Sequence, residues 1–237
     1  MKAQHFLKGM THGIPIFLGY LSVSFGFGIL AVKSGLSVME AAAVSLFNLT
    51  SAGQAAGVGI IAAGGSLVEM ILAQLTINLR YSLMSLSLSQ KLDKSFNTPR
   101  RLICSYGITD EIFALASTQP GLITPWYMYG MILVSGIGWV LGTILGAAAG
   151  SLLPADISDA LGLMLYGMFL AIILPPARKE KGVLAAVLTA AGISCIIYFL
   201  LPFISAGFSV IICAVISAVI CALLFPRDDE EEAEVQQ

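Results

Sequence analysis

The sequence predicts an all-α, polytopic integral membrane protein with about seven transmembrane helices (range about six to eight), including broken or re-entrant segments. Hydrophobic residues make up 57% of the chain and charged residues only 11%, and the mean hydropathy is +0.91. A soluble domain carries about 25% charged residues. The apolar residues also gather into segments near the ~20 residues that a membrane-spanning helix needs. This pattern leaves no room for a soluble domain.

The apolar segments are separated by turn-forming and charged residues. They lie at residues 13–32, 40–63, 66–88, 102–118, 126–151, 159–176, 183–201 and 206–225. We therefore divide the chain into an N-terminal tail (1–12), a single transmembrane domain (13–225) and an acidic tail (226–237). The acidic tail is a run of like charges, so we expect it to be disordered and cytosolic.

Basic residues in short loops set the orientation, because they stay on the cytosolic side. If every segment crosses, the basic residues at 91–101 and those at 178–181 fall on opposite sides of the membrane, in conflict with this rule. The conflict disappears if the short segment 102–118 does not cross, which gives about seven spans and an outside N-terminus. In a rival arrangement, segment 40–63 also turns back, at 51–54, leaving about six spans and an N-terminus inside. Both arrangements place the C-terminus and the 89–101 loop in the cytosol.

Charge counting slightly favours the rival, whereas the two full-length apolar segments around Gly64 and Gly65 favour the arrangement with more spans. A weak internal similarity also favours it. Gly13–Pro15 and Gly121–Pro125 open two segments that would run in opposite directions there, as in an inverted repeat.

Small residues recur at every fourth position of one segment: Gly138, Gly142, Gly146 and Gly150. Such a ridge lets two helix backbones approach closely. It predicts either helix packing within the chain or a docking face for a partner subunit.

A polar face is predicted on segment 66–88, where Gln74, Asn78 and Arg80 interrupt the apolar sequence. Arg80 lies about 20 Å along a helix that begins near Ser66, at about 1.5 Å per residue. Ionised side chains inside the membrane are costly and usually functional. The alternative is an arginine that extends its head to the cytosolic headgroups.

Thr109, Asp110 and Glu111 precede an apolar sequence and predict a helix start within or beside the membrane. The acidic pair could bind a proton or an ammonium group, or could simply cap the helix at the interface.

Residues 48–57 form a polar, glycine-rich interruption that includes Ser51, Gly53 and Gln54. Unwound backbone within a membrane is tolerated where it lines a cavity, and transporters bind substrate carboxylates at the half-helix starts of such breaks. The alternative is a packing face formed by Gly53 and Gly57.

An enzyme is not expected, because the chain lacks the HExxH, GxSxG and P-loop motifs. No cofactor or metal site is expected either, since the cysteines form no CxxC motif. No basic cluster indicates nucleic-acid binding.

Five blocks resemble the AzlC family, the large subunits of bacterial branched-chain amino acid exporters: Gly13–Pro15 with Phe25–Gly28, Thr50–Gln54, Asn78–Tyr81 and Gly107–Glu111. The resemblance covers about residues 10–225. It implies an inner-membrane secondary transporter that acts with a small membrane subunit of the AzlD type. Family members commonly carry Asp and His where this chain has Asn78 and Tyr81, so a proton role for that Asp is in question here.

Taken together, the residues and the resemblance suggest a proton-driven exporter of branched-chain amino acids. A zwitterion needs a cation, an anion and an apolar pocket. Arg80 or the half-helix after Gly53, with Ser51, Gln54, Gln74 and Asn78, would hold the carboxylate; Asp110 or Glu111 would hold the ammonium group or the proton. The alternatives are a channel or permease for another solute, or a non-transporting assembly subunit with Arg80 and Asp110 as a structural ion pair.

Overall fold

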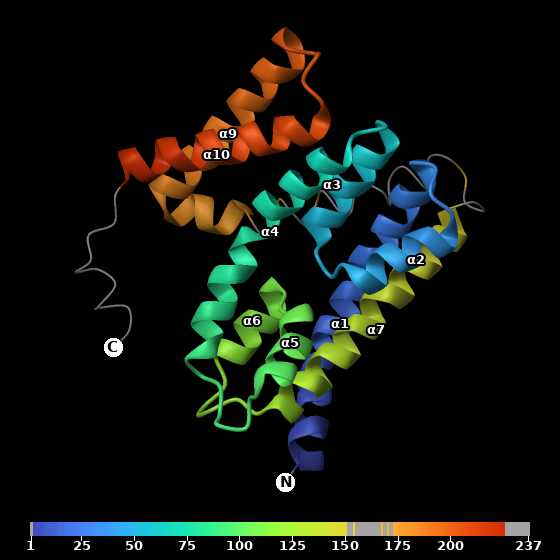
Figure 1. The fold of residues 1–237 in the computed structure, drawn as a ribbon, viewed down its shortest axis with the longest axis vertical. Coiled ribbons are helices and arrows are strands. Elements are labelled where there is room, and N and C mark those ends of the chain that lie inside the picture. Colours follow the sequence, from blue (N-terminus) through green and yellow to red (C-terminus); the bar gives the residue numbers. More distant parts are fainter. Residues whose placement is uncertain (1, 151–153, 155–166, 168–169, 171–172, 226–237) are drawn as a thin grey trace.

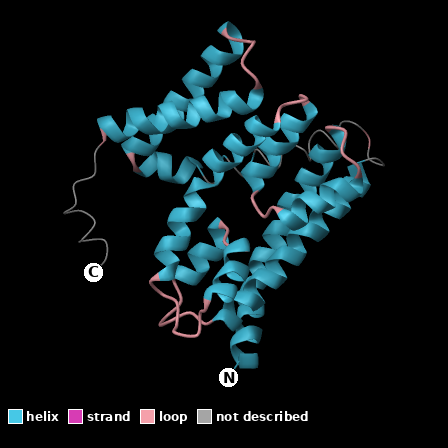
Figure 2. Cartoon of the chain, viewed as in Figure 1, coloured by secondary structure: helices cyan, strands magenta, loops and turns pink. Residues whose placement is uncertain are grey.

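The computed structural model describes residues 2–150, 154, 167, 170 and 173–225. Its helices are α1 (Lys2–Lys33), α2 (Val38–Phe47), α3 (Ser51–Ala62), α4 (Leu67–Ser89), α5 (Thr98–Tyr106), α6 (Asp110–Ser117), α7 (Pro125–Gly150), α9 (Lys181–Leu200) and α10 (Ala206–Leu224). In the same residues, one isolated bridge joins Leu92 and Ile123. Figure 2 shows how completely helices dominate the described part.

Four of the described helices, α1, α7, α9 and α10, are long and apolar enough to cross a membrane. α4 has 23 residues, which is about 35 Å at 1.5 Å per residue, but its sequence is more polar. The predicted helical membrane fold is confirmed, while the number of spans stays a prediction. Most of the segment at 159–176 and the whole tail at 226–237 lie outside the described residues.

The glycine ridge of α7 packs against α1. Gly138 faces Phe17, Gly142 faces Leu21, Gly146 faces Phe25 and Gly150 faces Ile29. A Cβ at the first three positions would collide with backbone atoms of α1, so only glycine permits this approach. The ridge therefore packs against α1 within the chain, which is the first of the two predicted alternatives.

These contacts also give the direction of the two helices. Residue numbers rise together along both, so α1 and α7 run parallel and side by side (Figure 1). The opposite directions predicted for these two segments, as in an inverted repeat, are therefore wrong. The predicted tail at 1–12 is instead helical from Lys2 onward. Gly9 packs on the backbone of Tyr127, so the contact between α1 and α7 continues into this segment.

The two interrupted segments each form a pair of short helices. Segment 40–63 breaks at Asn48–Thr50 between α2 and α3, and segment 102–118 breaks at Gly107–Thr109 between α5 and α6. In Figure 1, α3 leads back from its break toward the end of the molecule at which α2 begins.

The loops on either side of the α5–α6 pair are bonded to each other. Lys91 Nζ donates to the carbonyls of Ser117 at 2.5 Å and Gln119 at 2.9 Å. Asp93 N donates to Ile123 O at 3.0 Å. The chain thus enters and leaves this pair at one end, as expected for a segment that does not cross the membrane.

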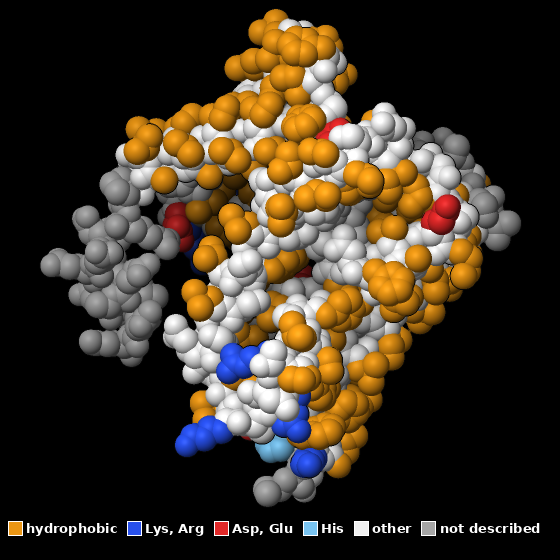
Figure 3. Space-filling view, in the orientation of Figure 1, with side chains coloured by type: hydrophobic (Ala, Val, Ile, Leu, Met, Phe, Trp, Pro, Cys, Tyr) orange, Lys and Arg blue, Asp and Glu red, His pale blue; other side chains and the backbone are white. Residues whose placement is uncertain are grey.

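The start of α1 lies at this same end. His12 Nδ1 is 3.3 Å from Gln119 Nε2 and 3.0 Å from Tyr127 OH. The N-terminus and the 89–101 loop are therefore on one side, which contradicts the arrangement with an outside N-terminus and agrees with the rival. In Figure 3, Lys and Arg side chains gather at the end of the molecule near the N-terminus, below a surface rich in hydrophobic side chains.

The end of α10 that follows the loop from α9 is fastened to α4 through Glu69. This carboxylate, 4% exposed as a residue, accepts from Ser205 Oγ at 2.5 Å and from the Gly207 amide at 2.8 Å. It thereby satisfies amides that the start of α10 leaves without intrahelical partners.

Candidate functional site

Two half-helices begin inside the molecule with the same kind of cap. Thr50 accepts a hydrogen bond from the Gly53 amide at 3.3 Å, and Thr109 accepts one from the Ile112 amide at 3.4 Å. The first amides of any helix lack intrahelical acceptors and carry a partial positive charge. In α6, the side chains of Asp110 and Glu111 lie in the first turn, whereas α3 has no acidic residue there. The start of α3 is therefore the one suited to an external anion.

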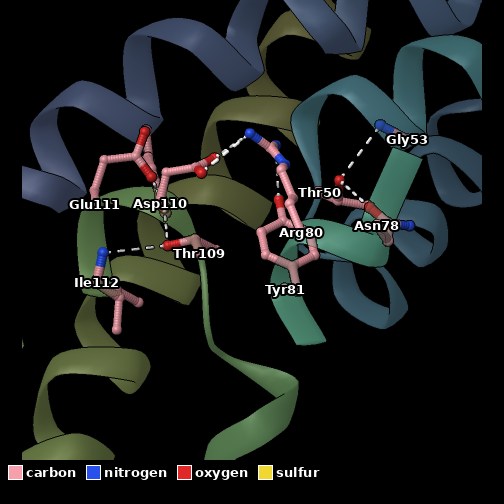
Figure 4. Close-up of polar contacts among 10 residues, drawn as sticks. Thr50, Gly53, Asn78, Arg80, Tyr81, Thr109, Asp110, Glu111 and Ile112 are labelled. Carbon is pink, nitrogen blue, oxygen red and sulfur yellow. Dashed lines mark hydrogen bonds and ion pairs between the residues drawn. The ribbon is translucent and has the colours of Figure 1, made fainter. Parts of the chain in front are cut away.

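Arg80 on α4 reaches the first turn of α6 (Figure 4). Its Nη1 lies 3.0 Å from Asp110 Oδ1 and 2.9 Å from Asp110 Oδ2. Nη2 donates to Tyr81 OH at 3.2 Å, and the guanidinium lies 4.9 Å from the centre of the Tyr81 ring. The Arg80 and Asp110 side chains are 38% and 32% exposed. Arg80, near the middle of α4, thus forms a partly exposed ion pair with Asp110 of α6.

Glu111 is held from a different helix. Tyr20 OH on α1 donates to Glu111 Oε2 at 2.6 Å and lies 2.5 Å from Thr109 Oγ1. The Tyr20 residue is 7% exposed, and its ring meets Trp139 of α7 edge to face at 5.1 Å. The sequence interpretation missed Tyr20. A hydroxyl in the middle of an apolar segment is the one signal that could have pointed to it.

A closed set of hydrogen bonds ties the start of α3 to α4. Thr50 Oγ1 donates to Asn78 Oδ1 at 2.8 Å, and Asn78 Nδ2 donates to Gln74 Oε1 at 3.1 Å. Gln74 Nε2 donates to the Gly53 carbonyl at 2.7 Å. A Cβ on Gly53 would lie 2.6 Å from both Gln74 Oε1 and Thr50 Cγ2, so a larger residue there would make these side chains shift. These four residues position the half-helix beside Arg80.

Gln54 faces the protein core rather than the site. It is 1% exposed, and its amide nitrogen donates to the carbonyls of Val44 at 3.2 Å and Asn48. Its oxygen accepts from Trp139 Nε1 at 3.1 Å. The side chain satisfies the carbonyls at the end of α2 and so has a structural role, not the binding role that the sequence suggested.

Of the residues predicted from the sequence, the structure brings Arg80, Asp110, Glu111 and Asn78 into one region with the start of α3 (Figure 4). Ser51 occupies the first position of α3 and is partly exposed. Gly53 and Gln74 form the support beneath it. The arrangement places one guanidinium beside two carboxylates and a helix start free of acidic residues.

The chain matches the family model described as AzlC protein over residues 15–153. The chain belongs to the AzlC family. This match contains both helix breaks and Arg80, so the site lies within the part that defines the family. No solved structure matches the chain.

Three relatives are similar to this chain over most of their own length. The inner membrane protein YgaZ of Escherichia coli is 29% identical over 236 residues, covering 95% of this chain and 94% of the relative. An uncharacterized membrane protein of Archaeoglobus fulgidus is 35% identical over 188 residues, 78% of this chain and 82% of the relative. The branched-chain amino acid transport protein AzlC of Bacillus subtilis is 25% identical over 193 residues, 80% of this chain and 74% of the relative.

Proposed function

We propose that the chain is the larger subunit of a secondary transporter that exports branched-chain or similar small aliphatic amino acids across the bacterial inner membrane, driven by the proton gradient. The observation that carries this proposal is the partly exposed Arg80–Asp110 pair, set between the starts of two half-helices in a membrane protein. Membership of the AzlC family and the printed name of the Bacillus subtilis relative favour amino acids as substrates.

A free amino acid matches the charges of this region. An arginine has five N–H donors in a fixed fork, and Asp110 engages Nη1. The remaining donors, with the first amides of α3 near Ser51, suit the substrate carboxylate. The ammonium group then meets the carboxylates of Asp110 and Glu111, which lie on the other side of Arg80 in Figure 4.

The same proposal assigns the orientation and the partner. The end with the N-terminus and the 89–101 loop faces the cytosol, because Lys and Arg gather there. The C-terminus is cytosolic in this assignment. The partner is a small membrane subunit of the AzlD type, as the family resemblance implies.

The test is flux through proteoliposomes that contain the purified chain with its small partner. We expect a pH gradient to drive labelled leucine, isoleucine and valine several-fold faster than lysine or glutamate, and the chain without the partner serves as control. A complex that moves none of these amino acids would support the alternative of a structural assembly subunit, in which the Arg80–Asp110 pair only holds α4 to α6.

A further inference from the structure

We infer that Glu111, held by Tyr20, is the group that takes up the coupling proton, whereas Asp110 stays ionised as the partner of Arg80. This inference rests on the proposed transport function and divides the work between two adjacent carboxylates. It also assigns Tyr20 as a positioning residue on a helix that the sequence had not connected with the site.

The two carboxylates differ in their cationic partners. Both oxygens of Asp110 lie within 3.0 Å of Arg80 Nη1. Protonation of Asp110 would therefore leave the guanidinium without its counter-charge inside the membrane, which is unfavourable. Among the described residues, no Lys, Arg or His forms an ion pair with Glu111. Protonation of Glu111 instead removes the repulsion between two neighbouring negative charges.

The groups around Glu111 can accommodate both of its protonation states. Tyr20 of α1 bonds Glu111 directly and Asp110 precedes it on α6, while Arg80 and Tyr81 of α4 lie beyond Asp110. α7 contributes Trp139, which does not titrate, against the Tyr20 ring. Glu111 is an exposed residue, so the Tyr20 contact does not enclose its carboxylate.

Tyr20 has one hydroxyl hydrogen and two oxygen neighbours, Glu111 Oε2 at 2.6 Å and Thr109 Oγ1 at 2.5 Å. When Glu111 is ionised, the phenol donates to the carboxylate. When Glu111 carries the proton, the acid donates to the phenol oxygen and the phenol hydrogen turns to Thr109. One proton enters from solution and forms the O–H bond of Glu111, while the phenol keeps its own O–H bond. The cap of α6 is affected because Thr109 Oγ1 also accepts from the Ile112 amide.

This hydrogen-bond relay connects proton uptake to the position of the α1–α7 pair relative to α6 and α4. Tyr20 belongs to α1, which is locked to α7 by the glycine contacts. Thr109 caps α6 and Glu111 lies in its first turn, and α6 is tied to α4 through Asp110 and Arg80. A change in the Tyr20 hydrogen bond therefore acts at the contact between the α1–α7 pair and α6, the half-helix that carries the Asp110 and Glu111 carboxylates.

The first experiment measures the proton directly, by infrared difference spectroscopy of the purified complex titrated over pH. We expect the carboxylic acid C=O band that appears on acidification to be lost in Glu111→Gln and retained in Asp110→Asn. Tyr20→Phe should retain the band but shift its frequency and its titration midpoint, because one hydrogen bond is gone. A band lost in Asp110→Asn and kept in Glu111→Gln overturns the inference.

The second experiment compares gradient-driven leucine flux with leucine exchange at equal pH in proteoliposomes. Glu111→Gln should lose at least about tenfold more of the driven flux than of exchange, which it weakens because one of the two carboxylates that meet the ammonium group is gone. Tyr20→Phe should keep exchange, with a shifted pH profile of the driven flux. An active wild type whose Glu111→Gln variant remains fully driven overturns the assignment alone, whereas a wild type that moves no amino acid overturns the proposed function as well. If Glu111→Gln does not fold, Glu111→Asp, which keeps the carboxyl group, and Tyr20→Phe provide the same comparison of profiles.

Discussion

The α1–α7 interface makes the sharpest stability prediction, because one helix carries both a test position and a matched control. An ideal Cβ at Gly142 would lie 3.0 Å from Leu21 Cα and would overlap Leu21 O and Ser24 Oγ. Gly136, six residues away on the same helix, has no atom within 4 Å of its ideal Cβ. Gly142→Ala and Gly136→Ala therefore add the same methyl group in opposite environments.

The expected magnitude follows from two opposing contributions. Gly to Ala within a helix gains about 1 kcal/mol of propensity, and both variants share this gain. Overpacking costs about 1–3 kcal/mol. Gly142→Ala should lie in the upper part of that range, because the obstruction is backbone that cannot rotate away. The two variants should thus differ by about 2–3 kcal/mol, or roughly 4–12 °C in unfolding midpoint at about 2–4 °C per kcal/mol.

The assay is thermal unfolding of the purified protein in detergent, followed by the fluorescence of the tryptophans. Ser24→Ala combined with Gly142→Ala should restore stability only partly, because the Leu21 carbonyl remains in place. Equal midpoints for Gly142→Ala and Gly136→Ala would refute the close parallel packing of α1 on α7, and with it the direction assigned to the two helices.

Three further predictions follow from the described contacts. Arg80→Ala and Asp110→Ala should each lower the free energy of unfolding in detergent by about 1–3 kcal/mol. This is less than the ~3–5 kcal/mol cost of breaking a fully buried ion pair, because both side chains are about one third exposed. The double variant should recover stability but not leucine exchange; recovery of both would leave the pair a purely structural role. Single cysteines placed at Ser95 and Gln4, in a chain without native cysteines, should both resist labelling by an impermeant reagent in intact cells. Both should react with this reagent in inverted vesicles. Labelling of only one of them in intact cells would contradict the placement of both residues on the same side of the membrane. Glu69→Ala should raise amide hydrogen exchange in the first turn of α10 about tenfold, the effect of losing a helix cap. Glu69→Gln should raise it less, because its amide oxygen still accepts from the Gly207 amide. Equal effects of the two variants, or no effect of either, would show that Glu69 does not hold α10.

Much of the fold is readable from the sequence because membrane insertion imposes its own pattern. Hydropathy predicts the apolar segments, and loop charge predicts that segment 102–118 does not cross. The polar interruption predicts the break near Asn48. The direction of α1 relative to α7 was not readable. A four-residue glycine period predicts a close contact, but it names neither the partner helix nor whether the two helices run parallel.

The candidate site was predicted in part, for a related physical reason. Arg80, Asp110 and Glu111 stand out because charge within apolar sequence is costly, and the structure brings them together. Gln54 looked like a binding residue, yet it satisfies backbone carbonyls in the core. Tyr20 was not singled out in the sequence, yet it donates to Glu111. Residue type alone does not reveal which buried polar group meets backbone and which meets another functional side chain.

The central claim, that Arg80 anchors the substrate carboxylate, is tested most directly by competition between leucine and leucinamide. Leucinamide keeps the amino group and the side chain but lacks the carboxylate. A charge-assisted hydrogen bond contributes about 1.5–3 kcal/mol, so wild-type leucine exchange should be inhibited by leucine roughly 10- to 100-fold more strongly than by leucinamide. Arg80→Ala should lose this preference, and Arg80→Lys should recover only part of it, because lysine lacks the planar fork. An Arg80→Ala variant that folds, exchanges leucine and keeps the full preference for the carboxylate would contradict the account.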